Sequence, residues 1–430
     1  MNKKALIVSN NALSRSSNNG KTLNSFFSDF KQGSVSQIFF NDDVPDSDVA
    51  NSFYKITGRD QFLSLFKKNR YCAGEEIKIS PSVSEKKYIK KPPFSRFTYF
   101  VNANLEALKL IFRDVLYRCG LNKNQKILSW IREQNPSFIF FVVGNSLFPI
   151  SFVIYISRFF SIPIFVYITD DYVVYNEPSG LFGSLYRSAL IKSYKALFSS
   201  ANSIFFVCSE MRREFKRVYG VDGDCLINCN FVTAGNRQKR THKKHVKVVF
   251  AGGLHLGRAD SLVKFSQYMS GLCDEAGFSF DLDVYTNDSE ESLKLPNCQQ
   301  FGILFKGGIS WPELQAKLVE GDFLLHLESF DSKNIKKTKL SLSTKIPEYL
   351  SSGTCVIAFG PENLASIKIF KEEAIGIAIS HNNTPSEQLK LAITDEAYRD
   401  EIALKAKKYA EDHFSPRIIR SRLINKIMEI

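Results

Sequence analysis

The chain has 430 residues, more than one ordinary hydrophobic core holds, so two domains are expected. Hydrophobic residues make up 44% and charged residues 23%, which is the balance of a globular protein and excludes a disordered chain. The formal net charge of +13 favours anionic partners. Phosphorylated substrates, an anionic membrane surface and nucleic acid all fit this charge, and the charge alone does not choose among them.

The eight cysteines follow no disulfide or zinc spacing. Cys225 and Cys229 form the only close pair, and neither a second cysteine pair nor a histidine pair stands at ligand spacing. We therefore expect reduced thiols, no metal site and a cytoplasmic protein.

Two segments bear on membranes. The N-terminal apolar run is too short for a signal peptide and has the length of a buried strand. Residues 147–168 have the hydropathy of a membrane span, but they contain Arg158 and Pro163 and divide into a buried helix and a strand. The expected location is the cytoplasm, with peripheral binding to the inner face of the cell membrane as an extension of it.

Short apolar runs alternate with longer amphipathic segments, which is typical of βαβ units and a parallel sheet. In the first half, the predicted strands are 4–9, 35–40, 138–143, 164–169 and 203–208. Residues 59–135 are rich in Lys, Arg and aromatic side chains, and we expect helices and loops there.

A polar, basic stretch at 236–245 is predicted to be a linker, because it lacks apolar residues. The predicted strands beyond it are 246–251, 278–285, 299–305, 323–327, 354–359 and 375–379. Helices are expected at 311–319 and 345–351, and the amphipathic end should break at Ser415-Pro416.

These elements predict an α/β fold of two Rossmann-like domains facing a cleft. The first domain would span 1–235 and the second 246–400. The helices in 401–430 would pack back towards the first domain. Since ligands of such sheets lie beyond the carboxyl ends of the strands, the loops that follow the predicted strands carry the candidate site.

The loop after the first strand ends in Gly20-Lys21-Thr22, as a phosphate-binding P-loop does. Arg15 stands where that motif requires a glycine, so a nucleoside triphosphatase is disfavoured. A polar loop that opens a helix could bind acceptor hydroxyls through Asn18, Asn19 and Gly20. A merely solvated loop is the alternative.

A second loop follows the strand at 246–251 and contains Gly252, Gly253 and Arg258. Glycines let backbone amides and a helix N-terminus approach a phosphate, and a guanidinium offers two parallel donors to it. His255 in the same turn could contact donor phosphate or sugar. Glycines that serve a tight turn alone are the alternative.

The richest stretch runs through 323–330, a lysine-rich loop and 341–363. Ser343 and Thr344 suit a helix N-cap, and Pro347 suits the first helical turn. Lys345 at the positive end of that helix is electrostatically awkward unless an anion binds there. Glu348, one turn on, could accept two ribose hydroxyls.

Residues 343–358, STKIPEYLSSGTCVIA, resemble the donor-site helix and strand of family 4-like GT-B glycosyltransferases. The segments 248–253, VVFAGG, and 322–326, DFLLH, are similar to strands of their C-terminal domain. The segment 305–314, FKGGISWPEL, resembles the one whose backbone reads the nucleotide base. The resemblance implies a donor site that includes Gly308 and Ile309, and a metal-independent, retaining transferase without a cofactor.

The sequence departs from that family at one position. Many members carry two glutamates separated by seven residues, and Leu340 stands where the first should be. Glu348 matches the second, the ribose contact. The sugar contact would then be vacant or move to Glu328 or Glu362.

Asp170 and Asp171 follow the predicted strand at 164–169. Neighbouring carboxylates raise one another's pKa, which suits a catalytic base or a sugar anchor. A capping aspartate is the alternative. Asp281 and Asp283 spell the Asp-x-Asp of metal-dependent transferases but lie inside an alternating strand, so we expect no metal there.

The sequence thus predicts a transferase that moves a sugar from a nucleotide diphosphate sugar to a glycan or lipid-linked glycan of a bacterial surface polysaccharide. Arg258 and Lys345 would stabilise the departing diphosphate. Two alternatives are a nucleotide-sugar epimerase of the same fold and a basic nucleic-acid-binding protein. No nucleic-acid-binding motif is present, and no nucleic-acid partner is expected.

Overall fold

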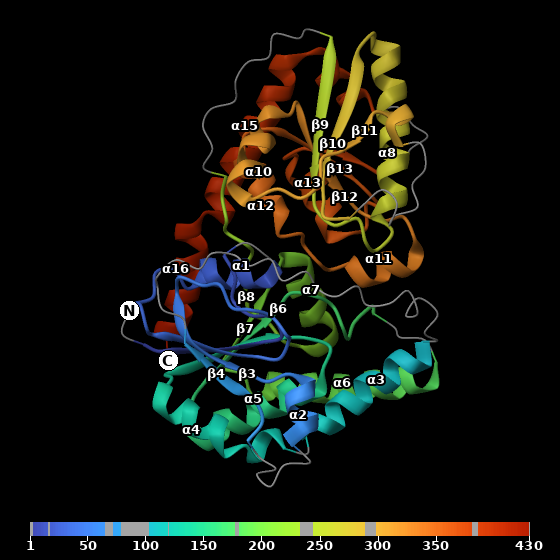
Figure 1. Cartoon of the computed structure of the whole chain (residues 1–430). Helices are drawn as coiled ribbons and strands as arrows, with labels where there is room; N and C mark the ends of the chain where they lie inside the picture. Colours follow the sequence, from blue (N-terminus) through green and yellow to red (C-terminus); the bar gives the residue numbers. More distant parts are fainter. Residues whose placement is uncertain are drawn as a thin grey trace. The chain divides into compact units, whose positions relative to one another are not determined.

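The computed structural model describes residues 3–15, 18–64, 72–78, 103–118, 120–176, 180–232, 244–288, 298–380 and 386–429 (Figure 1). It divides into two compact units. Unit 1 comprises Met1–Cys225 and Leu423–Ile430, and unit 2 comprises Leu226–Arg422. Each unit is an α/β body built on its own, mainly parallel sheet.

Unit 1 contains a sheet in the order β4-β3-β2-β1-β5-β6-β7-β8. Its strands are β1 Ala5–Ser9, β2 Val35–Phe39, β3 Ala50–Lys55, β4 Glu75–Lys78, β5 Phe138–Val143, β6 Ile164–Ile168, β7 Ser203–Phe206 and β8 Asp224–Cys225. All neighbours pair in parallel except β3 and β4. The strand order reverses between β1 and β5, where ligands of open α/β sheets bind.

The central strands of unit 1 are buried along their whole length, because helices cover both faces of a parallel sheet. Phenylalanine fills much of this core. The rings of Phe138 and Phe165 meet edge to face at 5.4 Å, and that of Phe140 lies 6.2 Å from Phe205. The high phenylalanine content of the chain therefore has a packing role here.

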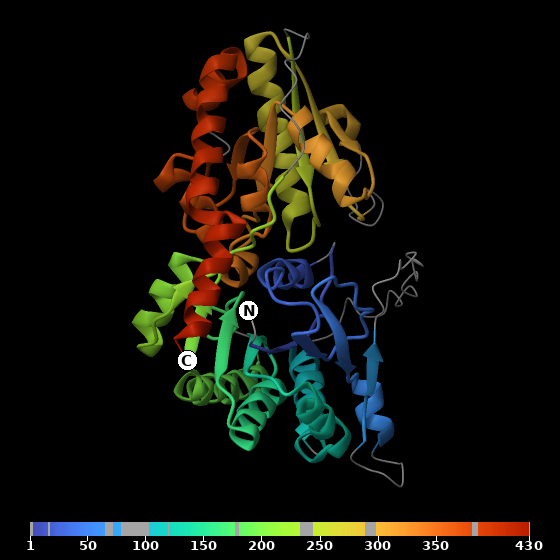
Figure 2. The ribbon, with the colours of Figure 1, turned by 90° about the vertical axis from the view of Figure 1, so that its left-hand side faces the viewer.

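The helices of unit 1 are α1 Asn18–Phe26, α2 Gly58–Ser64, α3 Ala103–Arg118, α4 Gln125–Gln134, α5 Leu147–Phe160, α6 Leu181–Ser200 and α7 Ser209–Tyr219. Helices α3, α5 and α6 pack on one another (Figure 1, Figure 2). Within the described residues, no helix has both the length and the apolar character needed to cross a membrane. The apolar stretch at 147–168 divides into α5 and β6, as predicted.

Unit 2 contains a fully parallel sheet in the order β11-β10-β9-β12-β13-β14. Its strands are β9 His245–Ala251, β10 Ser279–Tyr285, β11 Ile303–Phe305, β12 Phe323–Leu327, β13 Cys355–Phe359 and β14 Ile377–Ile379. Its helices are α8 Arg258–Ala276, α10 Trp311–Glu320, α11 Ser332–Thr338, α12 Lys345–Ser351, α13 Ala365–Glu373, α14 Glu387–Thr394 and α15 Glu396–Phe414. The strand order reverses between β9 and β12.

The predicted α/β fold with two Rossmann-like parallel-sheet bodies is confirmed. All eleven predicted strands are present, with ends that differ by up to four residues, and α15 stops at Phe414 before α16, Pro416–Met428. The expectation of only helices and loops across 59–135 is wrong at β4. Residues 65–71, 79–102 and 119 of that stretch, and 236–243 of the predicted linker, lie outside the described residues.

The sequence did not predict β3, β4 or β8, and the reasons are local. Strand β4 reads Glu-Glu-Ile-Lys and lies at the sheet edge, where charged residues are common and an apolar pattern is lacking. Strand β8 has only two residues, both half-buried. Strand β3 carries polar residues among its apolar ones, and its place comes from pairing with β2.

Asp114 joins three helices of unit 1. Ser146 makes no side-chain cap for α5, and the buried carboxylate of Asp114 accepts the N–H groups of Leu147 and Phe148 instead, at 3.1 and 3.0 Å. The hydroxyl of Tyr186 on α6 donates to the same carboxylate at 2.5 Å. A residue of α3 therefore caps α5 and holds α6.

We expect Asp114→Ala to lower the free energy of unfolding by about 2–4 kcal/mol, because buried donors of two helices lose their acceptor. Thermal and urea unfolding measure this loss. Asp412→Ala, which removes an exposed carboxylate, is the matched control and should change little. Equal stability of the two variants would show that Asp114 does not hold the helices together.

Candidate functional site

The glycine turn after β9 lies against Lys345, the first residue of α12. A Cβ atom built on Gly252 would collide with the Lys345 ammonium and lie 2.8 Å from its Cε. The backbone φ of Gly252 is +151°, which disfavours other residues. Only glycine therefore allows the ammonium to lie directly over this turn.

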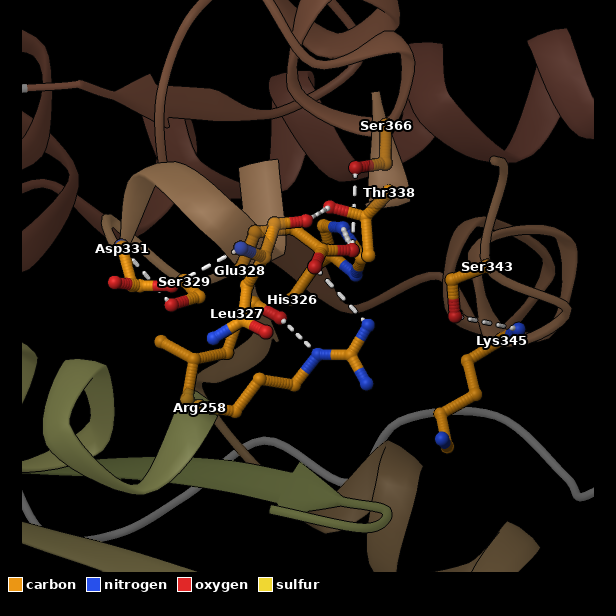
Figure 3. Close-up of polar contacts among 11 residues, drawn as sticks. Arg258, His326, Leu327, Glu328, Ser329, Asp331, Thr338, Ser343, Lys345 and Ser366 are labelled. Carbon is orange, nitrogen blue, oxygen red and sulfur yellow. Dashed lines mark hydrogen bonds and ion pairs between the residues drawn. The ribbon is translucent and has the colours of Figure 1, made fainter. Parts of the chain in front are cut away.

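Arg258 begins α8 at the other end of the same turn. Its Nε donates to the carbonyl oxygen of Leu327 at 3.0 Å, and its Nη2 donates to Oε2 of Glu328 at 3.0 Å (Figure 3). Gly257 precedes it in a left-handed conformation, φ +74°, with Ser329 so near that a Cβ would lie 2.5 Å from its Oγ. The end of β12 thus fixes the guanidinium.

Glu328 follows β12 and is 3% exposed. Besides Arg258, its carboxylate accepts a hydrogen bond from Ser366 Oγ at 3.3 Å. His326 Nε2 lies 3.5 Å from Oε1, but burial, with the nearby charges of Arg258 and Lys345, lowers the pKa of His326 to about 3. The imidazole is therefore neutral, and Arg258 is the cation that balances this buried carboxylate.

The pKa of His255 is also lowered, first by loss of solvent and then by Arg258, with a smaller effect of Lys345 in the same direction. The positive charges of Arg258 and Lys345 thus act together on both histidines. Asp288, which follows β10, opposes them at His255 and accepts the N–H of Leu254 at 2.8 Å. The result is a positive site beside β9 and β12, where the strand order of unit 2 reverses.

The start of α12 differs in part from the prediction. Ser343 Oγ accepts the N–H of Lys345 at 3.4 Å, so Ser343 caps the helix weakly, while Thr344 makes no side-chain cap. Glu348 is 6% exposed rather than open. Its Oε1 accepts from Asn228 Nδ2 at 3.2 Å, and the same amide donates to the Thr344 carbonyl at 2.7 Å.

Gly308 and Ile309 follow β11. A Cβ on Gly308 would collide with Asn287 Oδ1, so this glycine also marks a close approach at the carboxyl edge of the sheet. Ser310 and Glu313 form a capping box at the start of α10, which gives this glutamate a structural role.

Two predicted donor contacts have other partners. Glu328 pairs with Arg258, as described above. The side chain of Glu362 is 58% exposed and forms an ion pair with Lys371 at 2.8 Å, which is a surface arrangement. Sequence reasoning missed Asn228, Asn287 and Asp288. Asn287 and Asp288 follow a predicted strand, which was their only signal, whereas Asn228 follows β8, which the sequence did not predict.

The acidic pair in unit 1 is divided between two roles. Asp171 is 1% exposed and accepts the backbone N–H groups of Val173, Val174 and Tyr175 at 3.0, 2.7 and 2.7 Å. This arrangement is the capping role that the sequence left open as the alternative for Asp171. Asp170 is half-buried and accepts from Thr169 Oγ1 at 3.0 Å. It stays the candidate for chemistry.

The loop after β1 is closely packed at its glycine. A Cβ on Gly20 would collide with the carbonyl oxygen of Ala12, so Gly20 serves the approach of α1 to this loop. Asn19 is half-buried. The side chain of Asn18 and residues 16–17 lie outside the described part of the chain.

No protein-family model matches the sequence, and no curated protein matches it. Solved structures do match its fold. Sucrose-phosphate synthase from Thermosynechococcus elongatus superposes with a TM-score of 0.62 at 11% identity, covering 99% of this chain and 98% of that one. HepE from Anabaena, solved with UDP and glucose, gives 0.62 at 9% identity and full coverage of both chains.

This chain has the GT-B fold. A third GT-B structure, the lipopolysaccharide-biosynthesis glycosyltransferase WaaG, superposes with a TM-score of 0.53 at 12% identity, covering 97% of this chain and 98% of that one. At these identities the likeness shows the fold, and the chemistry must come from the residues of this chain.

We expect Gly252→Ala to weaken the binding of inorganic diphosphate on the order of tenfold, because the new methyl group displaces the Lys345 ammonium and one charge-assisted contact is lost. Calorimetric titration measures it. Gly271→Ala is the matched control, since a Cβ there meets nothing within 4 Å. Equal affinities for both variants would mean that Lys345 does not need this turn.

Proposed function

We propose that the protein is a glycosyltransferase that uses a nucleoside diphosphate sugar as donor. One observation carries the proposal: Arg258 and Lys345 flank one glycine turn at the carboxyl edge of a GT-B sheet, where the strand order reverses. Two cations at a half-buried glycine turn suit the negative charge that gathers on a departing diphosphate.

The remaining groups of this edge fit the rest of a nucleotide. Glu348 would accept the ribose hydroxyls, oriented by the amide of Asn228. The backbone at Gly308 and Ile309 would meet the base. The glycine turn and the Lys345 ammonium would meet the phosphates. The structure of HepE was solved with UDP and with UDP-glucose, which supports a nucleotide sugar as the ligand class.

In the reaction, the diphosphate leaves the anomeric carbon as an acceptor hydroxyl attacks it. Arg258 and Lys345 would stabilise the leaving group through fixed donors rather than through a metal ion. Asp170 in unit 1 would anchor or deprotonate the acceptor hydroxyl. Retention of anomeric configuration is part of the proposal, resting on the resemblance to family 4.

A lipid-linked glycan at an anionic membrane is the acceptor that we propose. Unit 1 carries an apolar ridge, formed by exposed Leu108, Phe112 and Val115 of α3 and by Leu181, Phe182 and Leu185 of α6. The three α3 residues share one helical face, and α3 packs against α6. Phe112 is 62% and Leu181 70% exposed.

The charge around the ridge is complementary to anionic lipid. Lys109 and Arg118 are exposed on α3, and Lys192 and Lys195 on α6. Helices α5 and α6 contain no acidic residue. An apolar face flanked by lysine and arginine is suited to the interface of a bilayer, where apolar side chains enter and cations meet head groups.

The decisive test uses Lys345 and Glu348. A charge-assisted contact contributes roughly 1.5–3 kcal/mol, so Lys345→Ala should weaken the binding of a nucleoside diphosphate about 10- to 150-fold. Glu348→Gln should weaken nucleotides with an intact ribose and leave inorganic diphosphate nearly unaffected. Calorimetry with UDP, GDP and ADP measures both.

The control is Lys317→Ala, a surface lysine that pairs with Glu320. If both site variants bind all three nucleotides as the wild type does, the donor site lies elsewhere. Transfer is then tested with nucleotide sugars and a lipid-linked acceptor, where recovery of an epimerised donor instead of a glycosylated product would favour an epimerase.

The apolar ridge has its own test. We expect the protein to sediment with phosphatidylglycerol vesicles and to be released by salt, because surface charges are screened. The double substitution Phe112→Ser and Leu185→Ser should reduce this binding on the order of tenfold or more, since two apolar side chains no longer enter the lipid. Leu404→Ser, at an exposed leucine of α15, is the control. Equal binding to neutral vesicles, or none to either, would remove the membrane from the proposal.

A further inference from the structure

We propose that Glu328 and the carbonyl group of Leu327 form a guanidinium seat that holds Arg258 in the geometry needed for the diphosphate. Glu328 is then a positioning residue and not a contact of the donor sugar. This inference rests on the proposed function, because it assigns the seat to the leaving-group site.

The protein's own groups form the seat. One edge of the Arg258 guanidinium, Nε and Nη2, is used by two parallel hydrogen bonds of 3.0 Å to Leu327 O and Glu328 Oε2. The third nitrogen, Nη1, points away from Glu328 and has no partner among the described residues (Figure 3). The guanidinium is therefore held along one edge and can donate hydrogen bonds to an anion from its other edge.

The carboxylate itself is held from several sides. The backbone N–H of Glu328 donates to the carbonyl of Phe359 at 2.9 Å, which continues the pairing of β12 with β13. Gly360 permits this position, since a Cβ there would lie 2.8 Å from Glu328 Cβ. Ser366 at the start of α13 donates to the carboxylate. The seat is thus as rigid as the sheet that carries it.

Burial makes the pairing obligatory. The side chain of Glu328 is 4% exposed, and a carboxylate buried so deeply needs a cation. His326 does not supply it, because that ring is neutral and packs against the ring of Phe370 at 6.0 Å. Burial and the contacts with Arg258 and Ser366 therefore assign this carboxylate to the protein rather than to a sugar.

The experiment uses chemical rescue. Arg258→Ala should weaken nucleoside diphosphate binding about 10- to 150-fold, and guanidinium ion below its denaturing range should occupy the empty seat and recover on the order of tenfold. The probe is whichever of UDP, GDP and ADP binds the wild type best. Sodium chloride at the same ionic strength is the control for screening.

The double variant Arg258→Ala/Glu328→Gln decides the assignment. Without the carboxylate the seat no longer holds the ion, so guanidinium should change its affinity by less than about twofold. Arg258→Ala/Glu328→Asp keeps the charge and should recover part of the rescue. Glu320→Gln in the Arg258→Ala background, at an exposed glutamate paired with Lys317, should leave the rescue intact.

A merely structural Glu328 would lower the melting temperature without abolishing rescue, so unfolding is followed in every variant. If Arg258→Ala fails to fold, Arg258→Lys is used instead. This variant keeps the positive charge but lacks the two parallel donors of a guanidinium, and its affinity for the nucleoside diphosphate should fall about tenfold. Equal rescue with and without the carboxylate, wild-type affinity of Arg258→Lys, or a Glu328→Gln variant that loses only sugar-bearing nucleotides would each overturn the seat. If the wild type binds no nucleoside diphosphate at all, the result contradicts the proposed function itself and not only the guanidinium seat.

Discussion

The absence of a side chain at Gly252 is the constraint on which the positive site of unit 2 depends. The Lys345 ammonium lies where a Cβ would be, directly over the backbone of the turn after β9. Lys345 comes from a helix far along the chain, and Arg258 comes from the far end of the turn itself. One glycine therefore lets a loop and a helix bring two cations to a single edge of the sheet, and like charges so placed are stable only with anions nearby.

Glu328 is the buried carboxylate that pairs with Arg258. Its carboxylate couples the first residue of α8 to the ends of β12 and β13, so the guanidinium takes its orientation from the edge of the sheet. The Lys345 ammonium lies over the glycine turn. A guanidinium oriented by the protein, with a second cation over the glycine turn, suits a site that must bind a diphosphate and then release it.

In unit 1, buried carboxylates stabilise the loop and the helices near the strand ends. The central strands of this unit are wholly buried, so its polar chemistry can reach the surface only at the strand ends, where Asp170 lies. The carboxylate of Asp171, the next residue, accepts three backbone N–H groups and thereby stabilises the loop that contains Asp170. Asp114 likewise accepts backbone N–H groups at the start of α5. Because it also accepts the hydroxyl of Tyr186, it links α3 to α6, the two helices that carry the apolar ridge.

The sequence by itself determined the parallel α/β architecture, because buried strands of such sheets are short apolar runs and the runs alternate with amphipathic helices. It also located the glycine turn, Arg258 and the helix at Lys345, since each is a local pattern with a local reason. The sequence did not determine which group each buried carboxylate binds. Glu328 meets Arg258 across 70 positions, and Glu348 meets Asn228 across 120. Tertiary structure decided those pairings, because the partner of a buried charge depends on the folded arrangement and produces no periodic pattern in the sequence. Strand β4 likewise forms only by pairing with its neighbour in the sheet.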